Sequence, residues 1–381
     1  MDDRTRQFEA ALGAPFTHGN QISVLKNGDE IFPAMLSAIE DAQVSIEFLT
    51  FIYWKGEIAE RLATTLANKA KRGVDTRVIL DAYGAYAMPR SLVQMMEISG
   101  VQVHWFRPLR FGRLSSAHHR THRKVLVIDG RTGFTGGVGV AKEWEGNAQS
   151  PTDWRDTHFR ITGPAVDGLR SAFIGNWAET ARPVTLSSPA IVDHDTSGSA
   201  MVQTVRSTAS FGWSDIATMI DTAINVARKR VRIATAYFVP DDDTVQLLCD
   251  TARRGVEIEI MLPGTYSDQR VSRLASEAAF SPLLDAGIKL WSYERTMLHC
   301  KIMLIDDDLC CVGTANFNQR SMRQDDELAL VVCDHALVAE LDGHFEEDLG
   351  ASERILSAHW RRRSLLQRIK ERAVRLVHGH V

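Results

Sequence analysis

Two stretches of the chain, HRKVLVID at 122–129 and HCKIMLID at 299–306, share the pattern His-x-Lys-x-x-x-x-Asp. Each runs into a short apolar segment, which is typical of a buried strand. Because side chains alternate along a strand, His122 and Lys124 point to one face, and so do His299 and Lys301. A single copy fits an edge strand with a solvated lysine equally well. The second copy in the same context favours a shared chemical role.

The sequence around the two stretches also repeats, in the same order. VSIEFLTFIYW at 44–54 resembles VRIATAYFVP at 231–240, and four further pairs of blocks follow at offsets of roughly 170 to 190 residues. The pairs are AKRGVDTRVIL with ARRGVEIEIML, ISGVQVHWF with DAGIKLWSY, TGFTGGVGVAKEW with VGTANFNQRSM, and DTHFRITGPAV with ELALVVCDHAL. Conserved order over this length indicates a tandem duplication of a unit of about 160 residues, a period too long for a solenoid.

Each unit alternates apolar runs with helical patterns. EIAERLATTLANKAKRG at 57–73, for example, places apolar residues on one helical face. Strand–helix alternation predicts an α/β fold: two duplicated units, each a mostly buried mixed β-sheet flanked by helices, related by pseudo-twofold symmetry. The predicted domains are a first unit at 1–185, a linker rich in Pro, Ser, Gly and Asp at 186–200, a second unit at 201–355 and a basic tail at 356–381.

Composition narrows the functional classes. The 381 residues carry a formal net charge of −4, which gives no global attraction to nucleic acid. The five cysteines are odd in number and form no C-x-x-C pair, so free thiols in a cytoplasmic setting are expected rather than a zinc site. The N-terminus lacks the apolar core of a signal peptide, and no apolar run is long enough to span a bilayer. Membrane contact is therefore expected to be peripheral.

The histidines and lysines suggest a reaction. If pseudo-twofold packing brings both His-x-Lys pairs to one cleft, two imidazoles and two ammonium groups face a common point. Such a site suits a phosphodiester: the ammonium groups neutralise the non-bridging oxygens, one imidazole attacks phosphorus and the other protonates the leaving oxygen.

With these two motifs the chain resembles the phospholipase D superfamily, and within it the bacterial cardiolipin synthases, in a short form without N-terminal transmembrane helices. The resemblance includes GNQISVLKNGDEIFPAMLSAI near the start, WRDTHFRITGPAV at 154–166, YFVPDD at 237–242 and LHCKIMLIDDDLCCVGTANFNQRS at 298–321.

The resemblance implies roles for individual residues. His122 and His299 are the nucleophile and the general acid, with His122 favoured as the nucleophile, and Lys124 and Lys301 bind phosphate. Asn316 adds a phosphate contact, whereas the first copy has Gly139 at the matching position.

The acids of the motifs are expected to support these groups. Asp129 and Asp306 end their strands and are expected to brace loops. Glu327 is expected to orient His299, and its repeat partner Asp156 to orient His122; surface ion pairing is the alternative for these two acids. The resemblance implies neither a cofactor nor a metal, because the lysines take the place of a metal.

Other candidate residues have simpler interpretations. His118 and His119 lack partners at metal-ligand spacing and are expected to be solvated. Cys300 lies on the face opposite His299 and Lys301 and is expected to pack as a small hydrophobic residue.

Two stretches suggest contact with anionic lipid. WFRPLRFGRL at 105–114 mixes aromatic residues with arginines, and 360–381 has an apolar helical face opposite a basic one. A terminal helix packed on its own domain is an equally good interpretation of the tail.

Three functions remain open. The first is a phosphatidyltransferase that makes cardiolipin from phosphatidylglycerol, with phosphatidylethanolamine as another candidate substrate, through a phosphatidyl-histidine and with release of a small alcohol. The enzyme would act peripherally on the inner face of the cell membrane, and no nucleic-acid partner is expected. The second is a phospholipase D-type hydrolase, acting on lipid or as a nuclease. The third is a catalytically dead membrane-binding relative, which the intact His-Lys pairs disfavour.

Overall fold

The computed structural model describes residues 3–108, 119–180, 192–208 and 214–363. Strands and helices alternate in both halves, as the apolar periodicity predicts. The first half contains α1 (Asp3–Leu12), β1 (Thr17–Lys26), α2 (Asn27–Asp41), β2 (Ser45–Thr50), α3 (Glu57–Lys71), β3 (Asp75–Asp81), α4 (Arg90–Ile98), β4 (Gln102–Phe106), β5 (Val125–Ile128), β6 (Thr132–Gly136), the 3-10 turn Lys142–Trp144, β7 (Trp154–Arg155), β8 (Thr157–Thr162) and α6 (Ala165–Thr180).

The second half repeats the main strands and helices of this order and adds short elements of its own. It contains β9 (Ala200–Ser207), α7 (Asp215–Val226), β10 (Arg230–Thr235), β11 (Phe238–Val239), α8 (Asp242–Arg253), β12 (Glu257–Pro263), α9 (Arg270–Glu277), α10 (Phe280–Asp285), β13 (Lys289–Tyr293), β14 (Met297–Leu298), β15 (Lys301–Ile305), β16 (Leu309–Gly313), β17 (Phe317–Asn318), α11 (Gln319–Arg323), β18 (Glu327–Cys333), α12 (His335–Leu349), β19 (Ser352–Ile355) and α13 (Ser357–Arg361).

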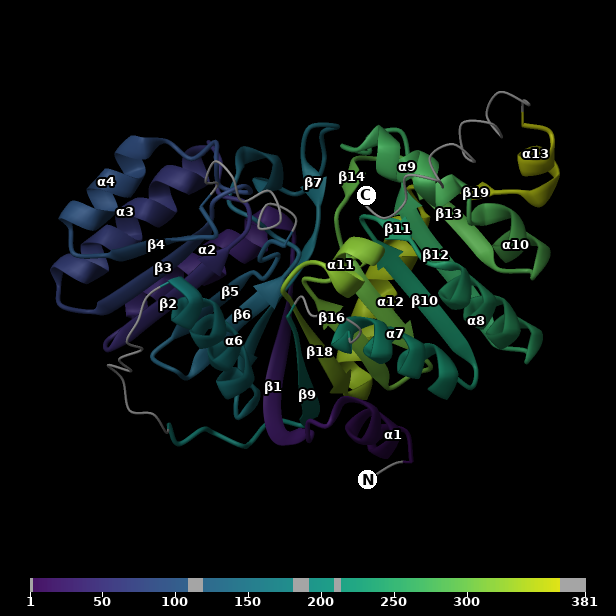
Figure 1. Ribbon diagram of the computed structural model, residues 1–381, viewed down its shortest axis with the longest axis horizontal. Coiled ribbons are helices and arrows are strands. Elements are labelled where there is room, and N and C mark those ends of the chain that lie inside the picture. The colour runs from purple at the N-terminus through teal and green to yellow at the C-terminus, as the bar shows by residue number, and fades with distance from the viewer. Residues whose placement is uncertain (1–2, 109–118, 181–191, 209–213, 364–381) are drawn as a thin grey trace.

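The two halves share one sheet. Within the described residues its order is β19-β13-β12-β10-β15-β16-β18-β9-β1-β8-β6-β5-β2-β3-β4, fifteen strands in all. The order reads the same way outward from the antiparallel β1–β9 contact, with β18 matching β8, β15 matching β5 and β10 matching β2. Figure 1 shows this contact at the centre, with the first half on one side and the second on the other. The fold is thus the predicted duplicated α/β arrangement with pseudo-twofold symmetry.

Three apolar clusters hold the sheet. One contains residues of α6, α12 and strands of both halves, so the core is continuous across the β1–β9 contact. The second packs α1, α7, α8 and α10 onto the strands of the second half, and the third packs α2, α3 and α4 onto those of the first. In α3 the predicted face is the buried one: Ile58, Leu62 and Leu66 are at most 2% exposed. A shared sheet and a shared core fix the relative position of the two motifs.

Candidate active site

Both motif histidines line one cavity. It has a volume of about 790 Å³ and is also lined by Lys124 and Asn316. His122 lies three residues before β5, and His299 lies two residues before β15, the pseudo-equivalent strand. Because these strands are related by the pseudo-twofold axis, the two motifs approach the cavity from opposite sides. The sequence prediction that both pairs meet in one cleft is confirmed for the two histidines and Lys124; Lys301 does not itself line this cavity, although its Nζ lies 3.3 Å from His299 Nε2.

Each imidazole is held by a buried carboxylate, but the expected pairing is wrong. His122 Nδ1 lies 2.8 Å from Glu327 Oε1, and His299 Nδ1 lies 2.7 Å from Asp156 Oδ2. Each histidine is therefore oriented by the acid of the other half. Both acids are fully buried, so the alternative of surface ion pairing is also wrong.

Backbone pairing between the halves explains this exchange. The segment leading to His299, β14, pairs in parallel with β7, and the His299 amide donates to the Arg155 carbonyl at 2.7 Å. In the same way the His122 amide donates to the Asp326 carbonyl at 2.9 Å, beside a bridge between Thr121 and Asp326. Each histidine thus lies next to the residue that precedes the other half's carboxylate. Spacing along the chain suggested pairing within a half because this register lies between segments distant in sequence.

The protonation states follow from burial. Burial lowers the pKa of His122 to about 4, and burial together with the Lys301 ammonium lowers the pKa of His299 to about 3. Burial opposes ionisation of Glu327 and Asp156, but the facing imidazole and lysine outweigh it and hold the pKa of each acid below its usual value. The ionised acids accept from the imidazoles, so Nδ1 carries the proton and Nε2 keeps a free lone pair. Two neutral imidazoles, each with an unprotonated Nε2, therefore line the cavity, and Lys301 Nζ lies 3.3 Å from the Nε2 of His299.

The lysines share one contact and differ in another: Lys301 Nζ also lies 3.1 and 3.3 Å from Nδ1 and Nε2 of His299, whereas among the described residues Lys124 Nζ has no such contact with the His122 ring. Lys124 Nζ donates to the His122 carbonyl at 2.8 Å, and Lys301 Nζ donates to the His299 carbonyl at 2.6 Å. Burial lowers the pKa of Lys124 to about 7 and also lowers the pKa of Lys301. Burial of an ammonium is costly even near the Glu327 and Asp156 carboxylates, so an entering phosphate would be attracted.

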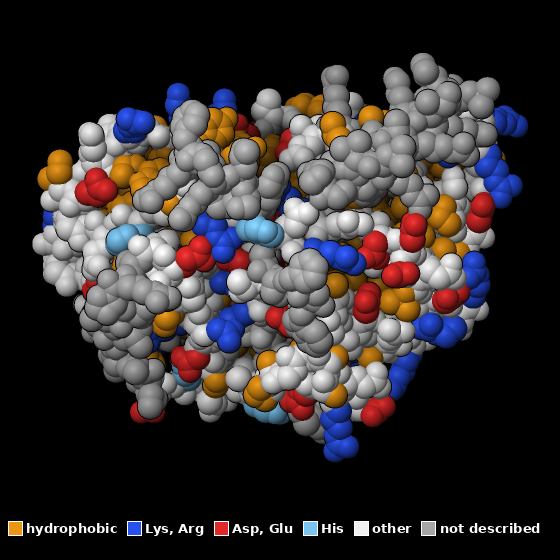
Figure 2. All heavy atoms as spheres, in the orientation of Figure 1, with side chains coloured by type: hydrophobic (Ala, Val, Ile, Leu, Met, Phe, Trp, Pro, Cys, Tyr) orange, Lys and Arg blue, Asp and Glu red, His pale blue; other side chains and the backbone are white. Residues whose placement is uncertain are grey.

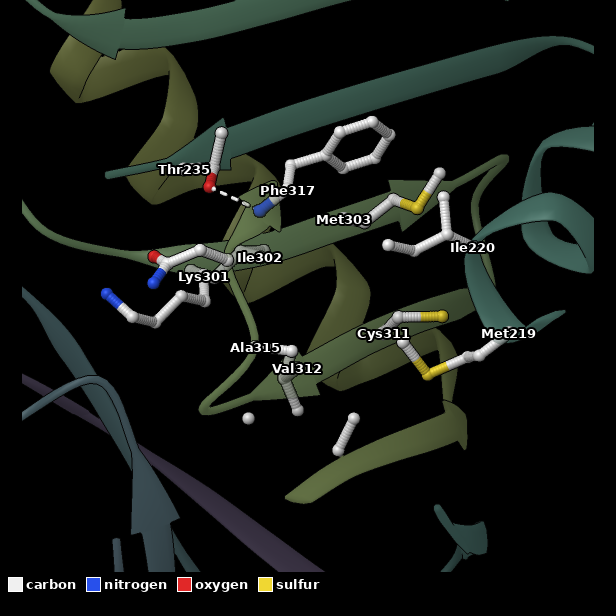
Figure 3. Close-up of a pocket in the computed structure, with 13 residues that line it drawn as sticks. Met219, Ile220, Thr235, Lys301, Ile302, Met303, Cys311, Val312, Ala315 and Phe317 are labelled. Atoms are coloured by element: carbon white, nitrogen blue, oxygen red, sulfur yellow. Dashed lines mark hydrogen bonds between the residues drawn. The ribbon is translucent and has the colours of Figure 1, made fainter. Parts of the chain in front are cut away.

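The aliphatic part of Lys301 lines a second cavity, which is separate from the main cavity and much smaller. Figure 3 shows it between β15, β16 and α7, lined by apolar side chains such as Ile220, Met303 and Cys311, with the Lys301 ammonium pointing away from them. Its volume is about 30 Å³, which is room for one or two waters. The apolar side chains around it pack against the aliphatic part of Lys301, and the cavity is too small to hold a substrate.

The two halves differ at the predicted asparagine. Asn316 lines the main cavity, is 4% exposed, and its side-chain carbonyl oxygen has no hydrogen-bond partner among the described residues. At the matching position a Cβ on Gly139 would lie 2.7 Å from Ile52 Cβ and 3.1 Å from Trp144 Cζ3. The first half therefore has no room for a second asparagine, because Ile52 occupies that space and Trp144 borders it.

The motif aspartates lie away from the cavity. The Asp129 carboxylate accepts from the backbone amides of Gln43, Val44 and Ser45, and the Asp306 carboxylate accepts from those of Arg228, Lys229 and Arg230. Each aspartate is the fifth residue after its lysine along an extended chain, a span of roughly 16 Å. These aspartates brace loops, as expected, and do not reach a phosphate bound at the lysines.

Sequence reasoning assigned no role to several aromatic residues around His299. The ring centroids of Trp154, Trp144 and Tyr237 lie 5.0, 5.3 and 6.3 Å from that of the imidazole, and Trp144 Nε1 also donates to Asp156 at 2.9 Å. The Tyr237 hydroxyl in turn donates to Asp268, whose pKa is raised by burial. Trp154 and Tyr237 lie in the stretches WRDTHF and YFVPDD, which are part of the family resemblance. That resemblance was the sequence signal that could have identified these two residues as part of the site.

The remaining predictions have mixed outcomes. Cys300 is 1% exposed and burial raises the pKa of its thiol to about 11, which fits a packed residue. His119 is exposed, and the described ranges contain no cluster of three metal-ligating side chains. His118, part of 105–114, part of the linker and residues 364–381 of the tail lie outside the described residues. Over the ranges that are described, no helix is long and apolar enough to cross a membrane.

Known proteins with similar sequences share one description. Residues 35–147 and 220–349 match the family model described as "Cardiolipin synthase, PLD-like domain". Cardiolipin synthase 1 of Bacillus cereus is 33% identical over 374 residues, covering 96% of this chain and 73% of that protein. A probable cardiolipin synthase of Bacillus subtilis is 32% identical over 387 residues, covering 99% of this chain and 76% of that protein.

Solved structures agree on the fold. The crystal structure of phosphatidylserine synthase from Haemophilus influenzae superimposes with a TM-score of 0.75 at 16% identity and covers 100% of both chains. Polyphosphate kinase from Porphyromonas gingivalis has a TM-score of 0.56 at 12% identity, covering 86% of this chain and 50% of that one. Similarity at these identities concerns the arrangement of strands and helices alone.

Proposed function

The chain belongs to the cardiolipin synthases of the phospholipase D superfamily, and from this premise we propose that it is a phosphatidyltransferase that joins two phosphatidylglycerols into cardiolipin and releases glycerol. The observation that carries the proposal is the pair of neutral imidazoles, each with an unprotonated Nε2, that line one cavity with Lys124 and Asn316. Donors and acceptors of this kind serve nucleophilic and acid–base catalysis at phosphorus.

In the first step His122 acts as the nucleophile. Its Nε2 lone pair forms a bond to phosphorus while the bond from phosphorus to the glycerol oxygen breaks. Protonated His299 donates its Nε2 proton to that oxygen, and glycerol leaves. Lys124 and Lys301 offset the charge on the non-bridging oxygens, and the Asn316 amide donates to one of them.

In the second step the free headgroup hydroxyl of another phosphatidylglycerol attacks the phosphatidyl-histidine. His299, now neutral, takes the hydroxyl proton, the new oxygen–phosphorus bond forms and the bond to His122 Nε2 breaks. Phosphorus is inverted twice, so its configuration is retained.

Phosphate binding allows His299 to take up from solvent the proton that the first step requires. In the free protein burial and the Lys301 ammonium keep His299 neutral. An anionic phosphodiester between the lysines offsets their charge, so the pKa of His299 rises and the imidazole can hold a proton. The Asp156 carboxylate, 2.7 Å from Nδ1, stabilises that imidazolium.

The lipid substrates and membrane contact extend the proposal. We expect phosphatidylglycerol as donor and acceptor, with phosphatidylethanolamine as an alternative substrate, at the anionic inner face of the cell membrane. The start of the tail packs on its own domain: the Trp360 ring lies 5.1 Å from that of Phe280, and Arg361 pairs with Asp285 at 2.7 Å. Only the part of the tail beyond these residues is a candidate for lipid contact.

One assay tests the reaction. Purified protein is incubated with mixed micelles of phosphatidylglycerol, and cardiolipin, phosphatidic acid and glycerol are quantified. Cardiolipin and glycerol in equal amounts support the proposal. Phosphatidic acid without cardiolipin would identify a hydrolase, and net inversion in a phosphorus-chiral substrate would contradict the covalent intermediate.

A further inference from the structure

Large apolar side chains are exposed at the mouth of the active-site cavity. Within the described ranges, Tyr83, Tyr86 and Val271 are 55%, 76% and 53% exposed, and all three line the cavity. Tyr266, on the loop that leads from β12 to α9 and its Val271, is 38% exposed but does not itself line the cavity. These four side chains, here called the rim, are most of the seven exposed large hydrophobic residues that the structure describes; the others are Val44, Ile98 and Leu356.

The rim comes from both halves at pseudo-equivalent places. Tyr83 and Tyr86 follow β3, and Tyr266 and Val271 follow β12, the strand that matches β3 across the β1–β9 contact. The mouth of the cavity is therefore flanked by apolar groups on two opposite sides. Figure 2 shows hydrophobic side chains interrupting the polar surface along the upper edge of the molecule.

The first side of the rim is held in place. Asp81, paired with Arg120 at 2.9 Å in a fully buried contact, accepts from the amides of Tyr83 and Gly84 at 2.9 and 3.0 Å. Trp54 Nε1 donates to the Gly84 carbonyl at 2.8 Å. A Cβ on Gly84 would lie 2.2 Å from the Phe51 carbonyl, so the turn packs too tightly to fold inward. The fixed backbone of this turn therefore keeps the side chains of Tyr83 and Tyr86 exposed to solvent.

The second side is fixed in a comparable way. The Gly264 amide donates to the Tyr293 carbonyl at 2.9 Å, and the Thr265 amide donates to the Glu294 carboxylate at 3.0 Å. Both anchors come from β13 or the residue that follows it. An ordered apolar rim on two sides of one opening is a cost to a protein in water, which indicates a partner for it.

The size of the cavity indicates what that partner is. About 790 Å³ is the volume of a site for one drug-sized ligand. This accommodates the phosphodiester headgroups but leaves the long acyl chains of the donor and acceptor lipids outside. Those chains stay in the bilayer if the mouth faces it, and tyrosine is a side chain suited to the boundary between lipid and water.

We propose that the rim of Tyr83, Tyr86, Tyr266 and Val271 docks the active-site mouth onto the surface of a phospholipid bilayer. The inference rests on the proposed function, because a lipid substrate is what requires the mouth to face lipid. It differs from docking by a basic tail in its physical basis: the rim inserts apolar groups, and such binding survives high salt, whereas surface charges are screened over about 3 Å at 1 M salt.

Vesicle sedimentation tests the rim without turnover. The full chain and the triple variant Tyr83→Ser/Tyr86→Ser/Val271→Ser are mixed with vesicles of equal parts phosphatidylglycerol and phosphatidylcholine in 1 M NaCl. We expect the variant to bind at least tenfold more weakly. The matched control Ile98→Ser removes a side chain that is 87% exposed and does not line the cavity, and it should bind like the parent. Equal binding by parent and triple variant, or equal loss in the control, would overturn the proposal.

Two further measurements complete the test. If the triple variant does not fold, the single variant Tyr86→Ser should still bind severalfold more weakly than the parent, and unchanged binding there also overturns the inference. On vesicles the triple variant should lose at least ten times more of its rate than on a monomeric short-chain phosphatidylglycerol. Absence of turnover by the parent on both substrates would contradict the proposed function. The sedimentation result would still decide whether the rim binds the bilayer.

Discussion

The two histidine–carboxylate pairs are related by pseudo-symmetry but differ in their surroundings. His122 pairs with Glu327, which also accepts from the Thr314 hydroxyl, and its only ring neighbour among the described residues is Phe51, at 5.3 Å. His299 pairs with Asp156, which also accepts from the Trp144 indole.

His299 is also enclosed by three aromatic rings, those of Trp144, Trp154 and Tyr237. The shorter acid fits because residue 137 is Gly: a Cβ there would lie 2.1 Å from the Asp156 carboxylate.

The comparison shows that the duplicated fold places two similar imidazoles in one site, and that the side chains around each imidazole make the two environments different. The aromatic enclosure leaves His299 less room to move. A group that gives and takes protons from successive alcohols benefits from fixed orientation, and the nucleophile needs an open approach to phosphorus. The comparison therefore supports His122 as nucleophile and His299 as acid–base, and experiments can break or sharpen it.

The largest expected effect comes from removing the histidines themselves. We expect His299→Ala to lower kcat by roughly 10²–10⁴-fold, the contribution of an acid–base group, and His122→Ala to lower it further. A p-nitrophenyl phosphodiester, whose leaving group needs no proton, separates the roles. It should restore a burst of nitrophenol in His299→Ala and none in His122→Ala. The opposite pattern would reverse the two roles.

Substitution of the carboxylates should lower kcat by less than removal of the histidines, and each acid should act through the histidine that it contacts. Glu327→Gln and Asp156→Asn each misorient one imidazole, so we expect kcat to fall by roughly 10²-fold with little change in vesicle binding. In double-mutant cycles Glu327→Gln should be non-additive with His122→Ala, and Asp156→Asn with His299→Ala. Coupling of Glu327 to His299 instead would show that the contact between halves is not the functional one.

Acid should destabilise both pairs. Each histidine has a pKa of about 6.5 when unfolded and about 4 or 3 when folded, so between pH 6.5 and the folded value the unfolded chain binds more protons. Stability is thus present above pH 6.5 and is lost as the pH falls. From pH 7 to 5 each histidine should cost on the order of 2 kcal/mol.

Melting temperatures measure this effect. His122→Gln and His299→Gln should each flatten the decline of Tm between pH 7 and 5, and the exposed control His119→Gln should leave it unchanged. The two histidine–carboxylate pairs should differ in their pH dependence only below about pH 4, because His122 takes up its proton before His299 does. A parent Tm that is constant from pH 7 to 5 would contradict the burial argument.

The smallest effect concerns the missing asparagine. Asn316→Ala removes one hydrogen bond to the anionic phosphate, worth about 1.5 kcal/mol, so kcat/KM should fall about tenfold. Gly139→Asn should not add a matching contact, because its Cβ would overlap Ile52; we expect it to lower Tm instead. A gain of activity in Gly139→Asn would show that the two halves are more alike than their packing indicates.

The sequence by itself determined the fold and the reacting groups. The duplicated blocks predicted two α/β units in pseudo-twofold relation, because hydrophobic periodicity and turn residues are local properties of a chain. The paired His-x-Lys stretches identified His122, Lys124, His299 and Lys301, because alternation along a strand places each pair on one face. The aspartates were correctly separated from the chemistry because they lie at the far ends of the motif strands.

Only the tertiary structure decided which acid serves which histidine. The pairing of β14 with β7, and of Thr121 with Asp326, sets a register between segments that lie far apart in the chain. No local pattern encodes that register; it arises when the two halves close around the β1–β9 contact. The aromatic enclosure of His299 and the apolar rim depend on the same closure, because each assembles side chains from segments that meet only after the sheet has formed.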